Sequence, residues 1–284
     1  MYVSMEGMLK EANKNNYAVM AINCFNLETA RAVIRAAEAE RAPIIVNLFQ
    51  DHLLHHFDSG LSAPLVKTLA QRSSTQIALN FDHGQEVPYL LKAIDDGFSS
   101  VMVDASRFDL EGNIAMTKEV VEYAHPRGVS VEGEIGCLGA SEGGAFTQEM
   151  MYTDPEQAKY FYDQTGIDAL AISIGTSHGD YPEGMIPKFD IDRLREIKRL
   201  TKAPLVLHGG SGSGEENILN SVKNGINKIN VGCDFMNANR DAVAEILKQQ
   251  PHINYYELMH EAETKSMELV RYYIKLSGSD HKIK

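Results

Sequence analysis

The chain has 284 residues, 44% of them hydrophobic, which excludes a disordered protein and allows a large core. Its formal net charge is −12, from 27 basic and 39 acidic residues, and no run of Lys or Arg is present, so we expect no nucleic-acid partner. The three cysteines are scattered, which predicts a reducing compartment. No apolar run approaches about 18 residues, so no membrane span is expected. The N-terminus lacks the basic start and apolar block of a secretory signal, so we expect a cytoplasmic location.

Short β-rich runs alternate with longer helical patterns along the chain. The predicted strands are residues 17–22, 43–48, 76–80, 99–103, 129–135, 169–174, 204–207 and 228–231. The helical patterns between them include residues 30–40, 87–96, 114–124, 155–164, 191–200, 215–223 and 238–248, and residues 255–276 predict a further C-terminal helix. Several strands are apolar nearly throughout, which is typical of a parallel sheet covered on both faces. The pattern predicts one α/β domain over residues 1–284, a closed (β/α)8 TIM barrel; a doubly wound open sheet is the alternative.

Three histidines that end strand-like runs are each followed by glycine: His83, His178 and His208. Neutral imidazole is the commonest protein ligand for zinc, and a catalytic zinc site keeps three protein ligands and one open position. The carboxyl ends of barrel strands meet at one mouth, where active sites form, so the three side chains are expected to converge. The alternative is that they are ordinary histidines that bind nothing. The pattern predicts a mononuclear zinc site open to substrate.

Four carboxylates accompany these histidines. Neighbours on an extended segment point different ways, so one of Asp82 and His83 can bind metal while the other faces substrate; the alternative for Asp82 is that it supports a metal ligand or caps a turn. Asp104 ends the fourth strand and either faces the same mouth or caps the following loop. Glu132 and Glu134 share one face of their strand, and a nearby cation would remove the cost of burying them; a solvated outer face is the alternative.

Two kinds of loop complete the candidate site. Glu142 lies in the glycine-rich segment 136–145 and is interpreted as an acid or base on a lid, or as an exposed residue of a plain loop. Residues 208–214 lie between a strand and a helix, and residues 229–234 end the last strand. Backbone N–H groups and a helix N-terminus at such positions favour binding of a phosphate group.

Together these residues resemble the class II (metal-dependent) fructose-bisphosphate and tagatose-bisphosphate aldolase family, from about residue 17 to residue 234. Segment 131–142 fits one family signature, and segments 82–84, 175–179, 208–212 and 228–230 fit others in the same order. The resemblance implies that His83, His178 and His208 are the zinc ligands. It implies that Asp82 exchanges a proton with the aldehyde oxygen and that Glu142 removes the donor's α-proton.

Further positions carry roles that the resemblance alone implies. Asp104 and Glu134 match residues that hold a second monovalent or divalent cation, or that orient the first. Asn230 matches the residue that contacts the enediolate. The positions implied to contact substrate or its phosphate are Gly179, Gly209, Ser211, Asn230 and Cys233. The C-terminal helix suits a homodimer or homotetramer by analogy with the family.

The chain also departs from the family pattern. Asn80 stands where an H-x-D-H motif has His, Phe49 where a small hydroxyl residue is expected, and Cys233 where Thr is usual. Gly232 replaces a residue that is Asp in some members, and the basic residue of bisphosphate-cleaving members is not evident near Glu263. A thiol is a weak donor, and a missing cation removes contacts to a second phosphate. We therefore predict that the metal chemistry is kept with a divergent substrate, and that fructose 1,6-bisphosphate is a poor one.

The predicted activity is reversible retro-aldol cleavage of a phosphorylated ketose or related sugar by a zinc-dependent aldehyde-lyase, giving a dihydroxyacetone phosphate-type donor and an aldehyde. One alternative is a metal-dependent sugar-phosphate isomerase or epimerase that uses the same enediolate. The other is a non-catalytic barrel subunit. The expected partner is a small phosphorylated sugar.

Overall fold

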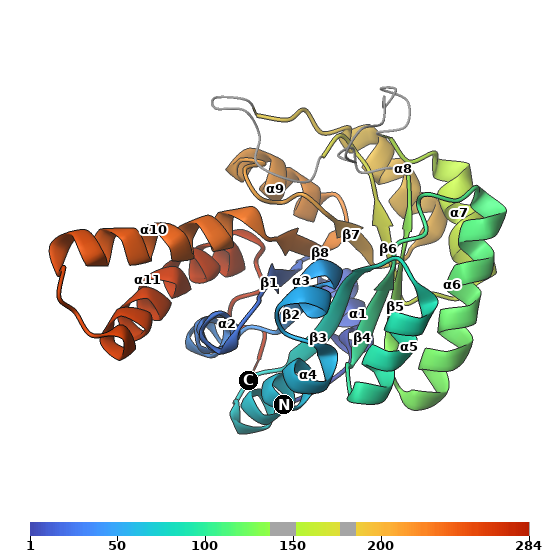
Figure 1. Cartoon of the computed structure of the whole chain (residues 1–284). Coiled ribbons are helices and arrows are strands. Elements are labelled where there is room, and N and C mark those ends of the chain that lie inside the picture. The colour runs from blue at the N-terminus through green and yellow to red at the C-terminus, as the bar shows by residue number, and fades with distance from the viewer. Residues whose placement is uncertain (137–151, 177–185, 284) are drawn as a thin grey trace.

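Eight parallel strands pair in chain order and close into a barrel in the computed structural model (Figure 1), which describes residues 1–136, 152–176 and 186–283. The strands are β1 (Val19–Asn23), β2 (Ile44–Phe49), β3 (Ile77–Gly84), β4 (Ser100–Val103), β5 (Ser130–Ile135), β6 (Ala169–Ile172), β7 (Leu205–Leu207) and β8 (Ile226–Val231). The pairing of β8 with β1 closes the sheet. The TIM-barrel prediction is therefore confirmed, and the open-sheet alternative is wrong.

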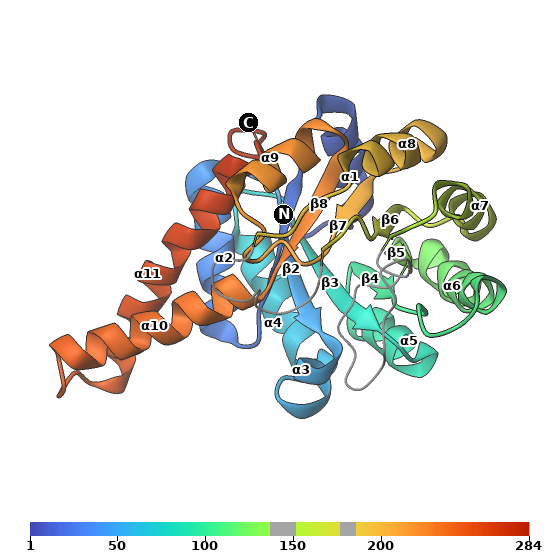
Figure 2. The ribbon, with the colours of Figure 1, turned by 90° about the horizontal axis from the view of Figure 1, so that it is seen from above.

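Helices surround the barrel, as the view from above shows (Figure 2). They are α2 (Leu27–Glu40), α4 (Ser59–Arg72), α5 (Val87–Asp96), α6 (Leu110–Ala124), α7 (Pro155–Thr165), α8 (Ile191–Thr201), α9 (Glu215–Lys223) and α10 (Cys233–Gln249), with the short α3 (Gln50–His55) and a 3-10 turn, η1 (His125–Arg127). Outward-facing strand residues such as Leu79, Val101 and Ile172 belong to the large apolar core beneath these helices. Both faces of the sheet are thus covered, which explains why the strands are apolar nearly throughout.

The barrel interior has an apolar floor. Inward-facing Ala21, Ile45 and Met102 pack in one cluster with Met5 and Leu9 of the N-terminal helix α1 (Met5–Asn15). The backbone N–H of Met5 donates to the hydroxyl oxygens of serines at the start of β4 and β5. Helix α1, which is additional to the predicted helices, therefore closes the amino-terminal end of the barrel and leaves the chemistry to the other end.

Helices α10 and α11 (Tyr255–Leu276) form a hairpin that projects from the side of the barrel in both views (Figures 1 and 2). A small apolar cluster that includes Ile246 and Leu258 joins the two helices. Helix α11 packs on α2, and buried Glu263 forms ion pairs with Arg31 and Arg35 of α2. The predicted C-terminal helix is therefore confirmed over its whole length. Within the described residues, no helix has the length and apolar character needed to cross a membrane.

Candidate active site

A β-bulge in β3 places two neighbouring side chains in the barrel mouth. Phe81 pairs with Val101 of β4, but Gly84 pairs with Val103, so Asp82 and His83 together oppose one residue. The backbone of His83 adopts φ = +53°, a conformation rare for residues other than glycine. Such bulges re-aim side chains near active sites. The prediction that Asp82 and His83 point different ways along an extended strand is therefore wrong, because the extra residue turns both inward.

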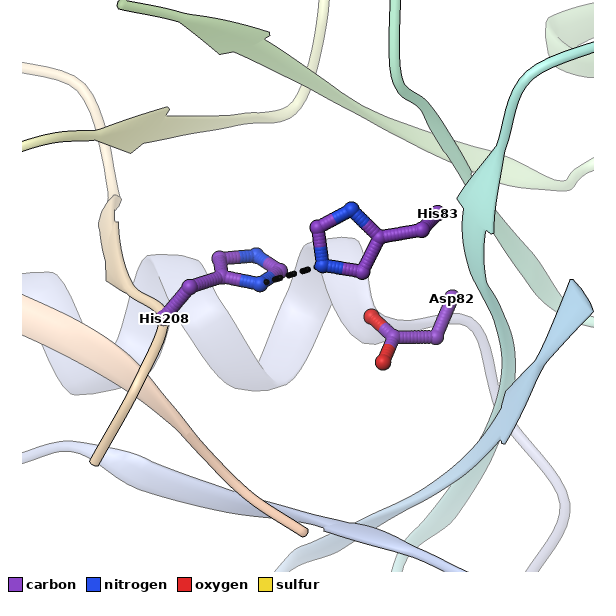
Figure 3. A group of neighbouring side chains, drawn as sticks. All are labelled: Asp82, His83 and His208. Carbon is purple, nitrogen blue, oxygen red and sulfur yellow. Dashed lines mark hydrogen bonds between the residues drawn. The ribbon is translucent and has the colours of Figure 1, made fainter. Parts of the chain in front are cut away.

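The imidazoles of His83 and His208 face each other across the mouth (Figure 3). His83 Nε2 lies 3.0 Å from His208 Nδ1. The other nitrogen of each ring contacts a carboxylate: His83 Nδ1 is 3.1 Å from Asp104 Oδ2, and His208 Nε2 is 2.8 Å from Glu132 Oε1. Metal-binding histidines usually hold their second nitrogen in this way, which fixes the tautomer and the ring orientation. Both rings are buried.

These nitrogens suit a zinc ion. In a tetrahedral site with Zn–N bonds of about 2.0–2.1 Å, two ligand nitrogens lie about 3.3 Å apart, close to the separation between His83 and His208. One carboxylate oxygen of Asp82 and one nitrogen of each histidine all lie within 4.8 Å of one another. If both outer nitrogens donate to carboxylates, the two inner lone pairs face each other and require a cation or a proton between them. The residues present therefore fit the metal that the sequence predicts.

Two amides hold the carboxylate of Asp82. Asn23 Nδ2 donates to Oδ2 over 2.8 Å, and Asn230 Nδ2 donates to Oδ1 over 3.0 Å. Burial acts to raise the pKa of Asp82, but the charges of His83, His208 and Lys228 and the hydrogen bond from Asn23 outweigh it, and the pKa is lowered. Asp82 is therefore ionised at neutral pH, so it can accept a proton from a substrate hydroxyl.

The charges of His83, Asp104 and Glu134 shift one another's pKa values. Burial opposes the charged form of His83, but Asp82, Asp104 and Glu134 outweigh it and raise the pKa of His83 to about 9. Burial and the negative charge of Asp104 raise the pKa of Glu134 to about 8. Burial acts against ionised Asp104, yet its hydrogen bond from His83 holds the pKa of Asp104 well below its usual range. In the absence of metal, a proton on His83 therefore adds a positive charge beside these carboxylates.

A second group could hold a cation beside the first. Ligand atoms of His83, Asp104 and Glu134 also lie within 4.8 Å of one another. Glu134 Oε2 is buried and has no hydrogen-bond partner among the described residues. Asp104 Oδ1 accepts hydrogen bonds from the backbone N–H and the hydroxyl of Ser106, so this residue both faces the mouth and caps its loop. Both interpretations of Asp104 are thus compatible with the structure.

Glu132 and Glu134 are both buried inside the barrel, so the solvated-face alternative is wrong. The cation beside Glu132 is a lysine: Lys228 Nζ donates to Glu132 Oε2 over 2.7 Å, and neither side chain is exposed. The sequence predicts a cation near these carboxylates but not its identity. Lysine is rarely fully buried, and Lys228 enters the prediction only as part of a family motif.

The turns after β7 and β8 lie against each other. The hydroxyl of Ser211 accepts the backbone N–H groups of Gly232 and Asp234, each over 3.2 Å. Gly209 has φ = +68°, and Cys233 begins α10. A Cβ on Gly210 would lie 2.7 Å from the backbone oxygen of a β8 residue, which explains glycine at this close approach. The structure thus brings Gly209, Ser211 and Cys233 to the same edge as Asn230.

Three predicted site residues lie outside the described residues: Glu142, His178 and Gly179. Sequence reasoning missed Asn23, which holds Asp82 from the end of β1. The available signal was weak: a polar residue ends an otherwise apolar strand whose C-terminal end faces the mouth.

The fold and these contacts define a (β/α)8 barrel with a candidate metal centre at its carboxyl-terminal mouth. The chain belongs to the class-II fructose-bisphosphate aldolase family, whose sequence profile matches residues 3–282. It is therefore an aldolase, a lyase, and this assignment favours the lyase prediction over the isomerase and the non-catalytic alternatives.

Individual relatives agree with this assignment. The chain is 38% identical over 253 residues to the fructose-bisphosphate aldolase of Geobacillus stearothermophilus and 37% identical to that of Staphylococcus aureus strain Mu50, with 88% of each chain covered in both cases. Among solved structures, the YdjI aldolase from Escherichia coli K12 superposes with a TM-score of 0.89 at 31% identity and full coverage of both chains.

Proposed function

We propose that this aldolase cleaves a phosphorylated ketose or related sugar reversibly, with a zinc ion held by His83, His178 and His208. The observation that carries the proposal is that one ligand atom from each of Asp82, His83 and His208 lies within 4.8 Å of the other two at the mouth of the barrel. When bound there, zinc supplies a Lewis acid that stabilises negative charge developing on the donor's ketone oxygen. Asp104 and Glu134 are proposed to orient the first cation or to hold a second.

Asp82 is the proposed proton acceptor in the cleavage direction. Its ionised carboxylate, held by two amides, takes the proton from the hydroxyl next to the bond that breaks, and the aldehyde leaves. In condensation the same group returns that proton to the aldehyde oxygen. Asn230 joins Asp82 to His208, which suits a residue that positions the enediolate oxygens. Glu142 is assigned as the base that exchanges the donor's α-proton.

The donor's phosphate is proposed to lie at the turns after β6, β7 and β8. Ser211 and Cys233 lie at the last two of these turns, together with Gly209, and the resemblance places Gly179 at the first. The N-termini of α9 and α10 begin at these turns, and helix N-termini favour anions.

The names of the relatives make fructose 1,6-bisphosphate the first substrate to test, and we propose that it is cleaved poorly. At the position near which bisphosphate-cleaving members carry a cation, Glu263 is a buried carboxylate paired with Arg31 and Arg35. The ring centroids of Phe49 and His83 are 5.8 Å apart, so an aromatic group borders the proposed metal site at the position where a hydroxyl residue is expected. Turnover of the bisphosphate equal to that of ketose 1-phosphates would refute this part.

The assembly is proposed to be a homodimer or homotetramer. The projecting hairpin supports this because Tyr255 and Tyr256, at the start of α11, are 76% and 78% exposed in the single chain. Light scattering on the purified protein tests it, and a monomer at micromolar concentration would refute it.

The decisive experiment separates two partial reactions of the zinc-loaded protein. Exchange of the donor's α-proton is followed in D2O by NMR, and C–C cleavage is followed with a panel of ketose phosphates. Asp82→Asn should abolish cleavage and leave exchange largely intact, while Asp95→Asn, a change at an exposed carboxylate, should alter neither. If the wild-type protein catalyses neither reaction, the proposal fails. If Asp82→Asn still cleaves, the role of Asp82 fails.

A further inference from the structure

An ion pair crosses the interior of the barrel beneath the candidate zinc site. Lys228 of β8 donates to Glu132 of β5 over 2.7 Å, and both side chains are 0% exposed. Removing two charges from water is costly, and an apolar pair of similar volume is often equally stable. Stability alone therefore gives no reason for this pair, which suggests another role.

The second oxygen of the same carboxylate contacts His208. Glu132 Oε1 lies 2.8 Å from His208 Nε2, while Asn230 Nδ2 donates to His208 Nδ1 over 3.2 Å. An acceptor at Nε2 and a donor at Nδ1 favour one tautomer, with the hydrogen on Nε2. In that tautomer the Nδ1 lone pair of His208 points toward His83 Nε2. The zinc ion is proposed to bind both of these nitrogens.

Glu132 differs from the other carboxylates of the site. Asp82, Asp104 and Glu134 each contribute an oxygen to a group of ligand atoms that could hold a cation, whereas Glu132 belongs to neither group. Its two oxygens are used by Lys228 and His208. The hydrogen-bonded route from Lys228 to the candidate metal site therefore passes through Glu132 and then through His208.

We propose that Glu132 and Lys228 form a positioning pair that sets the tautomer and ring orientation of His208 for metal binding. The inference rests on the proposed function, because it takes His208 as a zinc ligand. Lys228 supplies the counter-charge that keeps the Glu132 carboxylate in place, and Glu132 accepts the His208 Nε2 hydrogen. Partners of this kind typically contribute about 10- to 100-fold to metal affinity.

Two double variants isolate the hydrogen bond from the charge. Glu132→Gln/Lys228→Met and Glu132→Leu/Lys228→Met both remove the ion pair without changing the net charge of the barrel interior. Only the first keeps an oxygen that can accept from His208 Nε2. Ring ¹⁵N shifts of His208 in the metal-free protein report the tautomer, chelator competition gives the zinc dissociation constant, and thermal unfolding reports the fold.

We expect the glutamine variant to keep the Nε2–H tautomer and to bind zinc within about fivefold of wild type. We expect the leucine variant to show mixed tautomers and zinc binding weaker by about 10- to 100-fold. Equal zinc affinities and identical ring shifts in the two variants would overturn the inference. If the wild-type protein binds no zinc, the proposed function fails instead, and the ring spectra still decide whether Glu132 sets the tautomer.

If the leucine variant does not fold, Glu132→Asp replaces it. This change keeps the charge pair but shortens the side chain by one methylene, which withdraws the acceptor from His208. The same loss of zinc affinity and the same change in tautomer are expected, and wild-type values for both would overturn the inference.

Discussion

Zinc affinity should depend steeply on pH, because the metal-free site holds a proton where the ion is proposed to bind. The neighbouring carboxylates raise the pKa of buried His83 to about 9, even though burial itself opposes the charged form. At pH 7, zinc must displace a proton whose pKa lies about two units above the pH. That displacement costs about 2.7 kcal/mol relative to the deprotonated site, and about half of the sites still hold the proton at pH 9, so the apparent affinity should be about 50-fold weaker at pH 7 than at pH 9.

Glu134 adds to this effect below pH 8. Burial raises the pKa of Glu134 to about 8, so this carboxyl also holds a proton at pH 7 that an incoming cation would favour releasing. The logarithm of the zinc association constant should rise with a slope between one and two per pH unit from pH 7 to 8, and with a slope near one from pH 8 to 9. Chelator competition gives the constant, and calorimetry in two buffers counts the protons released.

The Glu134→Gln variant is the matched control, because it removes one titrating group and keeps the shape. Its slope should be no more than one over the whole range from pH 7 to 9. A zinc affinity that does not change over this range in the wild-type protein would refute the idea that a proton on His83 occupies the place of the metal.

The raised pKa of His83 also determines how the free energy of unfolding changes with pH. A folded-state pKa of about 9 for His83, above its ordinary value of 6.5, contributes stability that is fully present below pH 6.5 and lost as the pH rises through 9. Saturating zinc should therefore increase the free energy of unfolding more at pH 8 than at pH 6.5. Denaturant unfolding with and without zinc measures the difference, and an increment that shrinks with rising pH would contradict the sign.

Two substitutions test the packing around the site and the hairpin. Glu263→Gln should lower the free energy of unfolding in urea by about 1–3 kcal/mol, because two arginines lose a buried partner. The control, Glu6→Gln, lies in an exposed ion pair and should cost less than about 0.5 kcal/mol. Equal losses in the two variants would contradict the burial argument. Gly84→Ala would place a Cβ 2.3 Å from Leu90 Cδ2, so it should cost about 1–3 kcal/mol or more and weaken zinc binding at the adjacent bulge. Gly7→Ala, with nothing within 4 Å of the added Cβ, is its control and should be neutral or stabilising.

The barrel could be predicted from the sequence because its strands are apolar runs separated by amphipathic helices, a pattern that fixes the layers whatever the details. The ends of strands were less predictable where chemistry replaces apolar residues. The sequence pattern ends the third strand at Asn80, whereas β3 continues to Gly84. A polar side chain in a strand normally predicts a solvent-facing position unless its partner is known. The partners of Asp82 and His83, Asn230 and His208, lie on or beside strands far away in the chain.

The histidines and carboxylates of the site were predictable as residue types at strand ends, but their contacts were not. No local sequence pattern predicts the left-handed backbone conformation of His83, because this conformation lies at the bulge in the pairing of β3 with β4. The contact of buried Lys228 with Glu132 could not be predicted either, since the two residues lie on strands that do not pair and most lysines face solvent. The sequence therefore predicts which side chains carry chemistry, and tertiary pairing decides how each is aimed.

The bulge in β3 makes chain length as important as residue identity at this point. Successive strand residues face alternately into the barrel and toward the helices, so removing one residue between Phe81 and Gly84 would restore plain alternation. Either the carboxylate or the imidazole would then be turned into the apolar layer outside. Single-residue deletions should therefore be tolerated far less in this segment than in the loops around it, even where point substitutions are accepted.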